Sequence, residues 1–386
     1  MSLTFTITPV LAVELSPATV VQQALENDVC TGTVGLELAA TCATIASTPS
    51  GGGNAGSAGA STGVLNSTTY SDRAHKKSIE EREKELKEKG TGSGDILSGE
   101  RLGFFVSGQM TETERKNTTL ETGYESDTNG VTVGMDYFFT NQFVGGLAIS
   151  YSDTDLDFNS NAGFSDYESV SVTTYANFMV NNNFSIDGYV GWTGIDYDMQ
   201  RNISLTNAGG TPITDNGNAD TEANKILAGL NFYYKLNFNA LAINPSLKLD
   251  YSGTFLDGYS ETTTGTTGLA LQYDSQDVQS FKSNLGFNSS YDISIPWGVI
   301  IPQIHAGYVH EFLDDRRVVH ASFVQDVTNF DLQFQTDKPD RDYFVFGGGI
   351  SAVLVHSVQL FVNYERIEGH RYLNSYTVSG GVRVGL

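Results

Sequence analysis

The chain has 386 residues and a formal net charge of −23 at pH 7, and it is rich in glycine (41), phenylalanine (22) and tyrosine (19). So negative a charge argues against a nucleic-acid partner, because phosphate backbones are bound by basic surfaces. No run approaches 18 apolar residues, which argues against a transmembrane helix. Many glycines and aromatic residues without an apolar helix are typical of an all-β protein, either soluble or in an outer membrane.

Residues 1–13 are expected to be the remnant of a signal peptide. They contain a modest apolar stretch that ends in small residues, but no basic residue precedes it. A complete signal peptide has a charged start, an apolar centre and a small-residue end. The sequence therefore supports export, although only the apolar and small-residue parts of a signal peptide are present.

Residues 14–48 are expected to form a small helical segment. Ser16 and Pro17 have the residue types of a helix N-cap and first helical position, and they predict a helix to about Asp28. A second helix is predicted over 36–45. Cys30 and Cys42 are the only cysteines, and in an exported segment we expect them to form a disulfide that staples the helical hairpin. The alternative is two unpaired thiols in a cytosolic chain.

A linker rich in glycine and serine follows at 49–70. The next stretch, 71–89, is the most charged of the chain and predicts a long helix supported by Glu-to-Lys pairs four residues apart. Its only large apolar residues are Ile79 and Leu86, so it has no face to bury in an ordinary core. Two interpretations stay open from these residues: a solvated linker helix, or a helix inside a polar, water-filled tube.

From residue 101 to the end, twelve segments have the pattern of β-strands. Apolar and polar residues alternate over a dozen positions in 224–238 and 241–255, which is a strong strand signal. The twelve segments begin near Arg101, Gly130, Phe143, Ser169, Phe184, Asn224, Leu241, Ser280, Val299, Asp342, Val358 and Tyr376.

Three observations favour a membrane barrel over a soluble β-sandwich, which remains the minor alternative. The strands are longer than those of ordinary sheets and suit a tilted membrane crossing. Their number is even, and the chain ends within the last strand, so the first and last strands can pair. Tight turns alternate with long acidic loops, as in outer-membrane barrels; the long loops are expected at 111–126, 153–166, 201–220, 257–277 and 314–338.

If the apolar strand faces meet lipid, the opposite faces collect charges in the lumen. We expect these charges to face, and to pair with, a helix rich in lysine and glutamate; they are Lys235, Lys248, Asp250, Lys282, Glu311, Glu365 and Arg383. In the segment 342–355 the two faces are equally apolar and cannot be assigned. Its glycines at 347–349 are expected to mark a bulge or a place where the helix comes close.

The sequence contains no recognisable catalytic or metal motif. His310 and Glu311 are not followed by a second histidine at zinc-protease spacing, so Glu311 is interpreted as a lumen charge. Asp153, Asp155 and Asp157 resemble the start of a calcium loop but lack its glycine and glutamate, so we interpret them as an acidic surface loop. We therefore expect no enzyme, no cofactor and no metal. An outer-membrane enzyme with residues scattered over several strands remains an alternative.

Several segments together resemble the translocator (β) domain of bacterial autotransporters, the type V secretion family. The resemblance covers 101–386 and the preceding helix. The matching segments, in chain order, are RLGFFVSGQ at 101–109, the hairpin of 130–139 and 141–150, WGVIIPQIHAGYVHEF at 297–312, VNYERIEG at 362–369 and YTVSGGVRVGL at 376–386.

This resemblance implies an all-β fold: a 12-stranded antiparallel transmembrane β-barrel with an α-helix, here 71–89, in its lumen. It also implies an outer-membrane location, a passenger carried to the cell surface, here the short segment 14–48, and a role for outer-membrane lipids, the barrel-assembly machinery and periplasmic chaperones. We expect a monomer. The alternative function is a stand-alone outer-membrane channel or a surface barrel that binds ligands.

Two features depart from the family pattern. The family usually ends in an aromatic residue that the assembly machinery reads, whereas this chain ends in Leu386. Members that cut themselves inside the barrel use an Asn-Asn pair in the helix, and 71–89 contains no asparagine. We therefore expect the segment before the barrel to stay joined to it.

Overall fold

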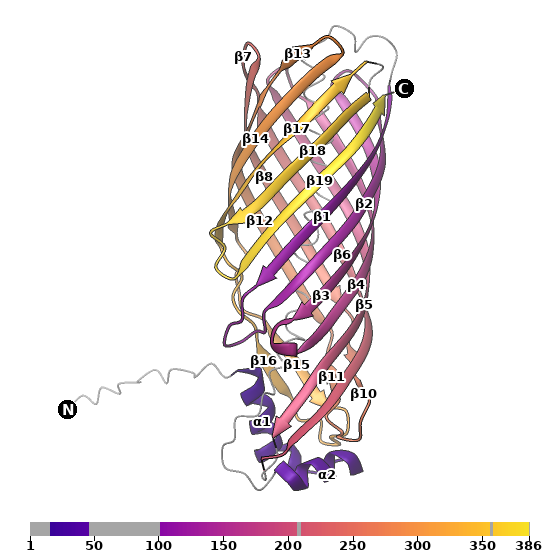
Figure 1. Ribbon diagram of the computed structural model, residues 1–386, viewed down its shortest axis with the longest axis vertical. Coiled ribbons are helices and arrows are strands. Elements are labelled where there is room, and N and C mark those ends of the chain that lie inside the picture. The colour runs from indigo at the N-terminus through magenta and orange to yellow at the C-terminus, as the bar shows by residue number, and fades with distance from the viewer. Residues whose placement is uncertain (1–15, 46–100, 207–209, 356–357, 386) are drawn as a thin grey trace, which may run out of the picture.

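The structure is a computed structural model that describes residues 16–45, 101–206, 210–355 and 358–385. Within these residues, twelve long strands form one antiparallel barrel, and the helices lie beyond one of its ends (Figure 1). None of the helices in the described ranges is both long and apolar enough to cross a membrane.

The barrel is closed by two pairings. Strand β1 pairs with β19, from Gly103 opposite Gly385 to Arg115 opposite Leu373, and β6 pairs with β8. The predicted 12-stranded antiparallel barrel is thereby confirmed. Its strands are β1 (Leu102–Arg115), β2 (Tyr124–Phe138), β3 (Phe143–Phe158), β4 (Gly163–Met179), β5 (Phe184–Thr206), β6 (Pro212–Tyr234), β8 (Leu241–Leu256), β12 (Gln276–Tyr291), β14 (Gly298–Glu311), β17 (Asp342–Leu354), β18 (Val358–Glu368) and β19 (Leu373–Gly385).

The two ends of the barrel differ. At the end where β1 begins and β19 finishes, the connections are short turns, and two of them are extended by β7 (Leu236–Phe238) and β13 (Ile293–Ile295). At the other end, the two longest loops carry a second sheet in the order β16-β15-β11-β9. Its strands are β9 (Tyr259–Ser260), β11 (Leu271–Tyr273), β15 (Val318–Phe323) and β16 (Leu332–Gln335); β10 (Thr262–Thr263) pairs with β6 and η2 (Asn159–Asn161) is a short turn of helix. We call these four strands the loop sheet.

The N-terminal helices form as their residues predict. Helix α1 (Pro17–Asn27) starts behind Ser16, whose hydroxyl accepts a hydrogen bond from the backbone N–H of Thr19 at 3.3 Å. A one-turn helix, η1 (Val29–Thr31), and α2 (Leu36–Ile45) follow. Both predicted helices are confirmed, and both lie at the long-loop end of the barrel (Figure 1).

Near the short turns, the strands point apolar side chains outward and polar ones inward. On β1, Phe104, Val106 and Met110 are exposed on the outer wall, whereas Ser107 and Gln109 are buried. Some inward hydroxyls pair across neighbouring strands, for example Thr132 with Ser150 at 2.7 Å. An apolar outer wall around a polar lumen is what a barrel in lipid requires.

Toward the long-loop end this polarity reverses. On β3 the outward residues are Asp153, Asp155 and Asp157, while Leu156 and Phe158 are buried inside. Carboxylates occupy the outward positions of all six strands β1–β6 at this level, often directly opposite one another: Glu112, Glu114, Glu125, Asp127, Asp153, Asp155, Asp157, Asp166, Glu168, Asp196, Asp198, Asp220 and Glu222. An acidic outer surface over an apolar interior suits a part of the barrel that is surrounded by water and not by lipid. The reversal therefore indicates where the barrel leaves the membrane.

This reversal corrects three loop predictions. The segments 153–166 and 201–220 are mostly strand, and 111–126 is strand over half of its length; the connections between the strands are only 116–123, 159–162 and 207–211. The acidic run at Asp153 is therefore the outer face of β3 and not a surface loop. The predicted loops at 257–277 and 314–338 do exist, but they contain the loop sheet.

The faces of β17 also become clear. Tyr343 and Val345 are buried on the inner side, while Phe344 and Phe346 are exposed on the outer wall. The expected bulge at 347–349 is wrong, because the pairing of β17 with β14 and β18 runs through these glycines without interruption. A Cβ at Gly347 would lie 2.4 Å from the His305 ring, so the missing side chain makes room for a neighbour on β14.

Three predicted segments lie outside the described residues: the signal remnant at 1–13, the linker at 49–70 and the charged helix at 71–89. The described residues on either side of 46–100 lie at opposite ends of the barrel. Helix α2 ends at Ile45 at the long-loop end, and β1 begins at Leu102 at the short-turn end (Figure 1).

Candidate functional site

Six of the seven predicted lumen charges occupy inward-facing strand positions, whereas Lys235 lies in the short connection after β6. Lys282 lies directly across from Asp250 on β8 and from Glu311 on β14, with its Nζ 3.9 Å from a Glu311 carboxylate oxygen. Glu311 is buried and also accepts hydrogen bonds from the Ser280 hydroxyl and the Phe281 N–H. The expected contacts of the lumen charges with the charged helix at 71–89 involve residues outside the described ranges.

The remaining lumen charges are distributed along the wall. Glu365 lies 2.9 Å from the His305 ring nitrogen, and the buried Arg383 lies 3.6 Å from the buried Asp136. Lys248 is opposite Asn231, which is buried on the inner side, and Lys235 follows β6 at the short-turn end. Groups of both signs thus line a polar lumen.

Cys30 and Cys42 form a disulfide, with their Cα atoms 5.3 Å apart. The bond joins η1 to α2 and so closes a hairpin of two helices, residues 17–45, which we call the cap. Both cysteines of the chain lie in the cap, and the disulfide uses both.

The cap packs against the loop sheet and the inner face of the extended strands. Val21, Leu25 and Leu38 of the cap are at most 5% exposed and belong to one apolar core with Phe323 and Phe334 of the loop sheet. The same core continues into the barrel through Tyr124, Leu156, Phe158, Tyr167, Ile195, Tyr197 and Met199. The inward apolar residues beyond the membrane therefore fill the long-loop end of the barrel together with the cap.

Gln325 makes most of the polar contacts between cap and loops. Its backbone carbonyl accepts a hydrogen bond from the Gly35 N–H at 2.8 Å, and its side-chain oxygen accepts one from the Leu38 N–H at 3.1 Å. Its side-chain nitrogen donates to the Glu37 carboxylate at 2.7 Å. Because the first N–H groups of a helix have no partner within it, Gln325 acts as an external N-cap for α2.

Two buried arginines join the long loops to the barrel wall. Arg201, near the end of β5, donates from Nε and Nη2 to the two carboxylate oxygens of Glu261 at 2.7 and 2.5 Å, and from Nη2 to the Leu269 carbonyl at 2.9 Å. Both side chains are at most 8% exposed. The paired carboxylate raises the pKa of Arg201 above its already high value against the opposing effect of burial, so the guanidinium stays charged.

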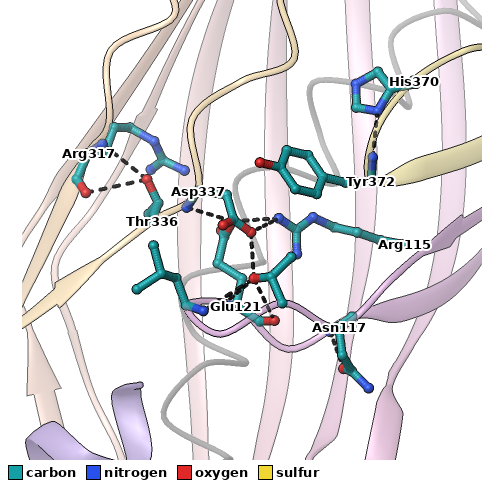
Figure 2. Close-up of polar contacts among 11 residues, drawn as sticks. Arg115, Asn117, Glu121, Arg317, Thr336, Asp337, His370 and Tyr372 are labelled. Carbon is teal, nitrogen blue, oxygen red and sulfur yellow. Dashed lines mark hydrogen bonds and ion pairs between the residues drawn. The ribbon is translucent and has the colours of Figure 1, made fainter. Parts of the chain in front are cut away.

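The second arginine contact is centred on Arg115, the last residue of β1 (Figure 2). Its Nη2 donates to Glu121 at 2.5 Å and to Asp337 at 2.8 Å, and the Asp337 N–H donates to Glu121 at 3.0 Å. The Tyr372 ring lies 5.5 Å from the guanidinium. One cation therefore holds together the β1–β2 loop, the β14–β17 loop and the residue before β19.

Among the pKa values that this arrangement shifts are those of Glu121 and Arg317. Burial, helped by the neighbouring Asp337, raises the pKa of Glu121 to about 7 even though Arg115 lies beside it. Burial also lowers the pKa of Arg317 on the β14–β17 loop, and the positive Arg115 acts in the same direction. The long-loop end thus contains a carboxyl group that changes its charge near neutral pH.

A cavity of about 340 Å³ opens beside this cluster. Basic and acidic side chains from three connections and from the adjoining strand ends line it, including Arg115, Glu121, Lys282, Glu311, Asp337 and His370. In the described part of the chain, no three His, Cys, Asp or Glu side chains are arranged to hold a metal ion. The cavity is therefore a mixed-charge space between the loops at the mouth of the lumen.

Sequence reasoning missed the two arginine contacts. Arg201 and Glu261 are 60 residues apart, and both fall in segments that were predicted as loops. The local signal at Arg115 was that it interrupts a run of acidic and small polar residues, TETER, whose outward positions are acidic. Arg201 lies between Gln200 and Asn202 and had no such signal.

A family model of the autotransporter beta-domain matches residues 104–365. The chain is 26% identical over 301 residues to outer membrane protein A of Rickettsia rickettsii, and 26% identical over 300 residues to that of Rickettsia conorii. These matches cover 76% of this chain but only 13% and 14% of those proteins, so the chain spans a small part of their length.

Solved structures agree with the fold. The translocator domain of the autotransporter NalP from Neisseria meningitidis aligns with a TM-score of 0.61 at 13% identity, covering 84% of this chain and 98% of that domain. The beta domain of the Bordetella autotransporter BrkA aligns with a TM-score of 0.53 at 16% identity, covering 74% and 100%. The family model, the barrel and its polar lumen lead to one identification: this chain belongs to the autotransporter family and contains an outer-membrane translocator barrel.

Proposed function

We propose that the barrel exports the segment that precedes it and then keeps that segment anchored at the cell surface. The observation that supports export is the position of the two parts of the chain: the cap lies at the long-loop end, whereas β1 begins at the short-turn end. Long loops face the exterior and short turns face the periplasm in outer-membrane barrels. A chain whose barrel begins on the periplasmic side and whose preceding segment lies outside has crossed the membrane.

The crossing segment in this proposal is 46–100, with the charged helix 71–89 in the lumen. Inward charges of both signs, such as Lys282, Glu311 and Arg383, suit a helix that carries lysine and glutamate in equal measure. Such pairs offset the cost of placing charges inside a barrel that excludes most water. Because 71–89 contains no asparagine, we propose that no cleavage occurs inside the barrel and that the cap stays covalently attached.

Surface labelling tests the export. An epitope inserted between residues 13 and 14 should be reached by an antibody on intact cells. The same epitope inserted in the short turn at 181–183 is the control, and it should be reached only after the outer membrane is permeabilised. An epitope before residue 14 that needs permeabilisation would refute the export of this segment.

Thiol labelling tests the lumen helix. Thr132 points inward at mid-barrel and is 1% exposed, and its neighbour Val133 points outward and is 47% exposed. In Thr132→Cys, deletion of residues 72–89 should increase the rate of reaction with a small charged thiol reagent by about tenfold or more, because reagent then enters from the short-turn side. The rate in Val133→Cys should not change. Equal rates for Thr132→Cys with and without residues 72–89 would contradict a helix in the lumen.

A further inference from the structure

We infer that the cap is a built-in lid of the barrel, which folds together with the loop sheet as one unit and closes the outer end only after it has emerged. The order of events rests on the proposed export, whereas the mutual folding of cap and loop sheet does not. The inference assigns residues 17–45 a structural partner on this same chain instead of treating them as an independent passenger.

The first argument is the size of the cap. Its two helices of 11 and 10 residues, with one disulfide, are well below the length at which a chain builds a sufficient core of its own. The apolar residues that a folded cap must bury meet the loop sheet instead. Leu38 is fully buried against this core, while Leu36, two positions earlier on α2, is 92% exposed. The cap therefore packs one face against the shared apolar core and exposes the other face to solvent.

The second argument is the reciprocal dependence of the loops. The loop sheet has four short strands of two to six residues, and a small sheet of this kind is not stable without a covering layer. Helix α1 covers β16, and Phe334 of β16 is 0% exposed in the shared core. Without the cap, Phe323, Leu332 and Phe334 would lose part of the apolar surface that keeps them out of water.

The third argument is the polar seam between the two parts. Gln325 uses both its backbone and its side chain for the cap, and Thr41 donates a hydrogen bond to the Thr267 carbonyl of the other long loop at 2.7 Å. Val34 and Asp326 form an isolated β-bridge. The cap thus bonds to both long loops, and these loops are fixed to the wall by Arg201 and Arg115. A continuous series of contacts therefore runs from the cap through the two long loops to the barrel wall.

Hydrogen exchange of the full-length protein in detergent micelles tests this inference with matched variants. In Leu38→Asp a charge would be buried in the shared core, so exchange should accelerate by about tenfold or more in α1, in α2 and equally in β11, β15 and β16. Leu36→Asp places the same charge on the exposed side of the same helix and should leave exchange unchanged. The strands of the barrel within the membrane should remain protected in both variants.

Two further variants cover the case in which Leu38→Asp disturbs folding as a whole. Gln325→Ala removes only the side-chain bonds of the seam and should accelerate exchange moderately in both α2 and β15. Phe334→Asp changes only the loop sheet and should deprotect α1. If the cap variants deprotect the cap while the loop sheet keeps its protection, the two parts fold independently and the lid is refuted. This result does not depend on whether the epitope test places the segment at the surface.

Discussion

Replacing Arg201 by methionine should destabilise the long-loop end of the barrel by about 3–5 kcal/mol while the membrane-spanning part stays folded. The substitution removes a cation that is hydrogen-bonded to both oxygens of Glu261 and to the Leu269 carbonyl. Glu261 would remain in the interior as a buried carboxylate without its partner, and breaking a buried pair in this way is far costlier than losing an exposed one. Cleavage of the 257–275 loop by thermolysin under native conditions measures the effect, since it reports the free energy of local opening.

A double substitution provides the control for this prediction. In Arg201→Met with Glu261→Leu, both charges are replaced by apolar groups of similar size, and the desolvation cost disappears together with the attraction. The double variant should recover most of the lost protection. A double variant as labile as the single one would show that the loop depends on the hydrogen bonds and packing of Arg201 rather than on charge balance.

Raising the pH from 4.5 to above 7 should weaken the contact between the β1–β2 and β14–β17 loops. Burial raises the pKa of Glu121 from 4.5 in the unfolded chain to about 7 in the folded protein, so the folded state binds the proton more tightly. The stability that this proton contributes is complete below pH 4.5 and is lost as the pH rises through about 7. The shift corresponds to roughly 3 kcal/mol.

The pH dependence of proteolysis in the 312–341 loop measures this effect. Glu121→Gln resembles the protonated acid, so its loop should lose much of the pH dependence and be better protected than the native loop at pH 8. Glu125→Gln, on the outer face of β2, is the matched control and should keep the native dependence. If Glu121→Gln and the native chain show the same slope, another group governs the pH response of these loops.

The membrane part of the barrel was predictable from local patterns. The alternation in 241–255 predicted β8 (Leu241–Leu256), and turn residues at 181–183 separated β4 from β5 as expected. Period-two alternation is a property of each strand alone. Within the membrane, apolar residues always point outward to lipid and polar residues inward to the lumen, so the alternation can be interpreted in the same way in every strand. The helices α1 and α2 were equally predictable, because Ser16, Pro17 and the residues of 36–45 act within one or two turns.

The outer end of the barrel was not predictable in the same way. In 153–166 the alternation continues, but acidic residues take the outward positions, and the sequence alone reads as a polar loop. The same alternation has opposite meanings on the two sides of the membrane boundary. No single strand marks that boundary, because it depends on the depth at which the whole barrel meets water.

The sequence by itself determined the type of fold: twelve strands, their order, the apolar outer wall and the presence of two short helices before the barrel. The tertiary structure decided what closes the outer end. Arg201 meets Glu261 and Leu38 meets the loop sheet across 60 to nearly 300 residues of chain, and these contacts bury charge and apolar surface together. Local patterns indicate which side chains avoid water. The distant residues that they contact in place of water come together only when the barrel closes.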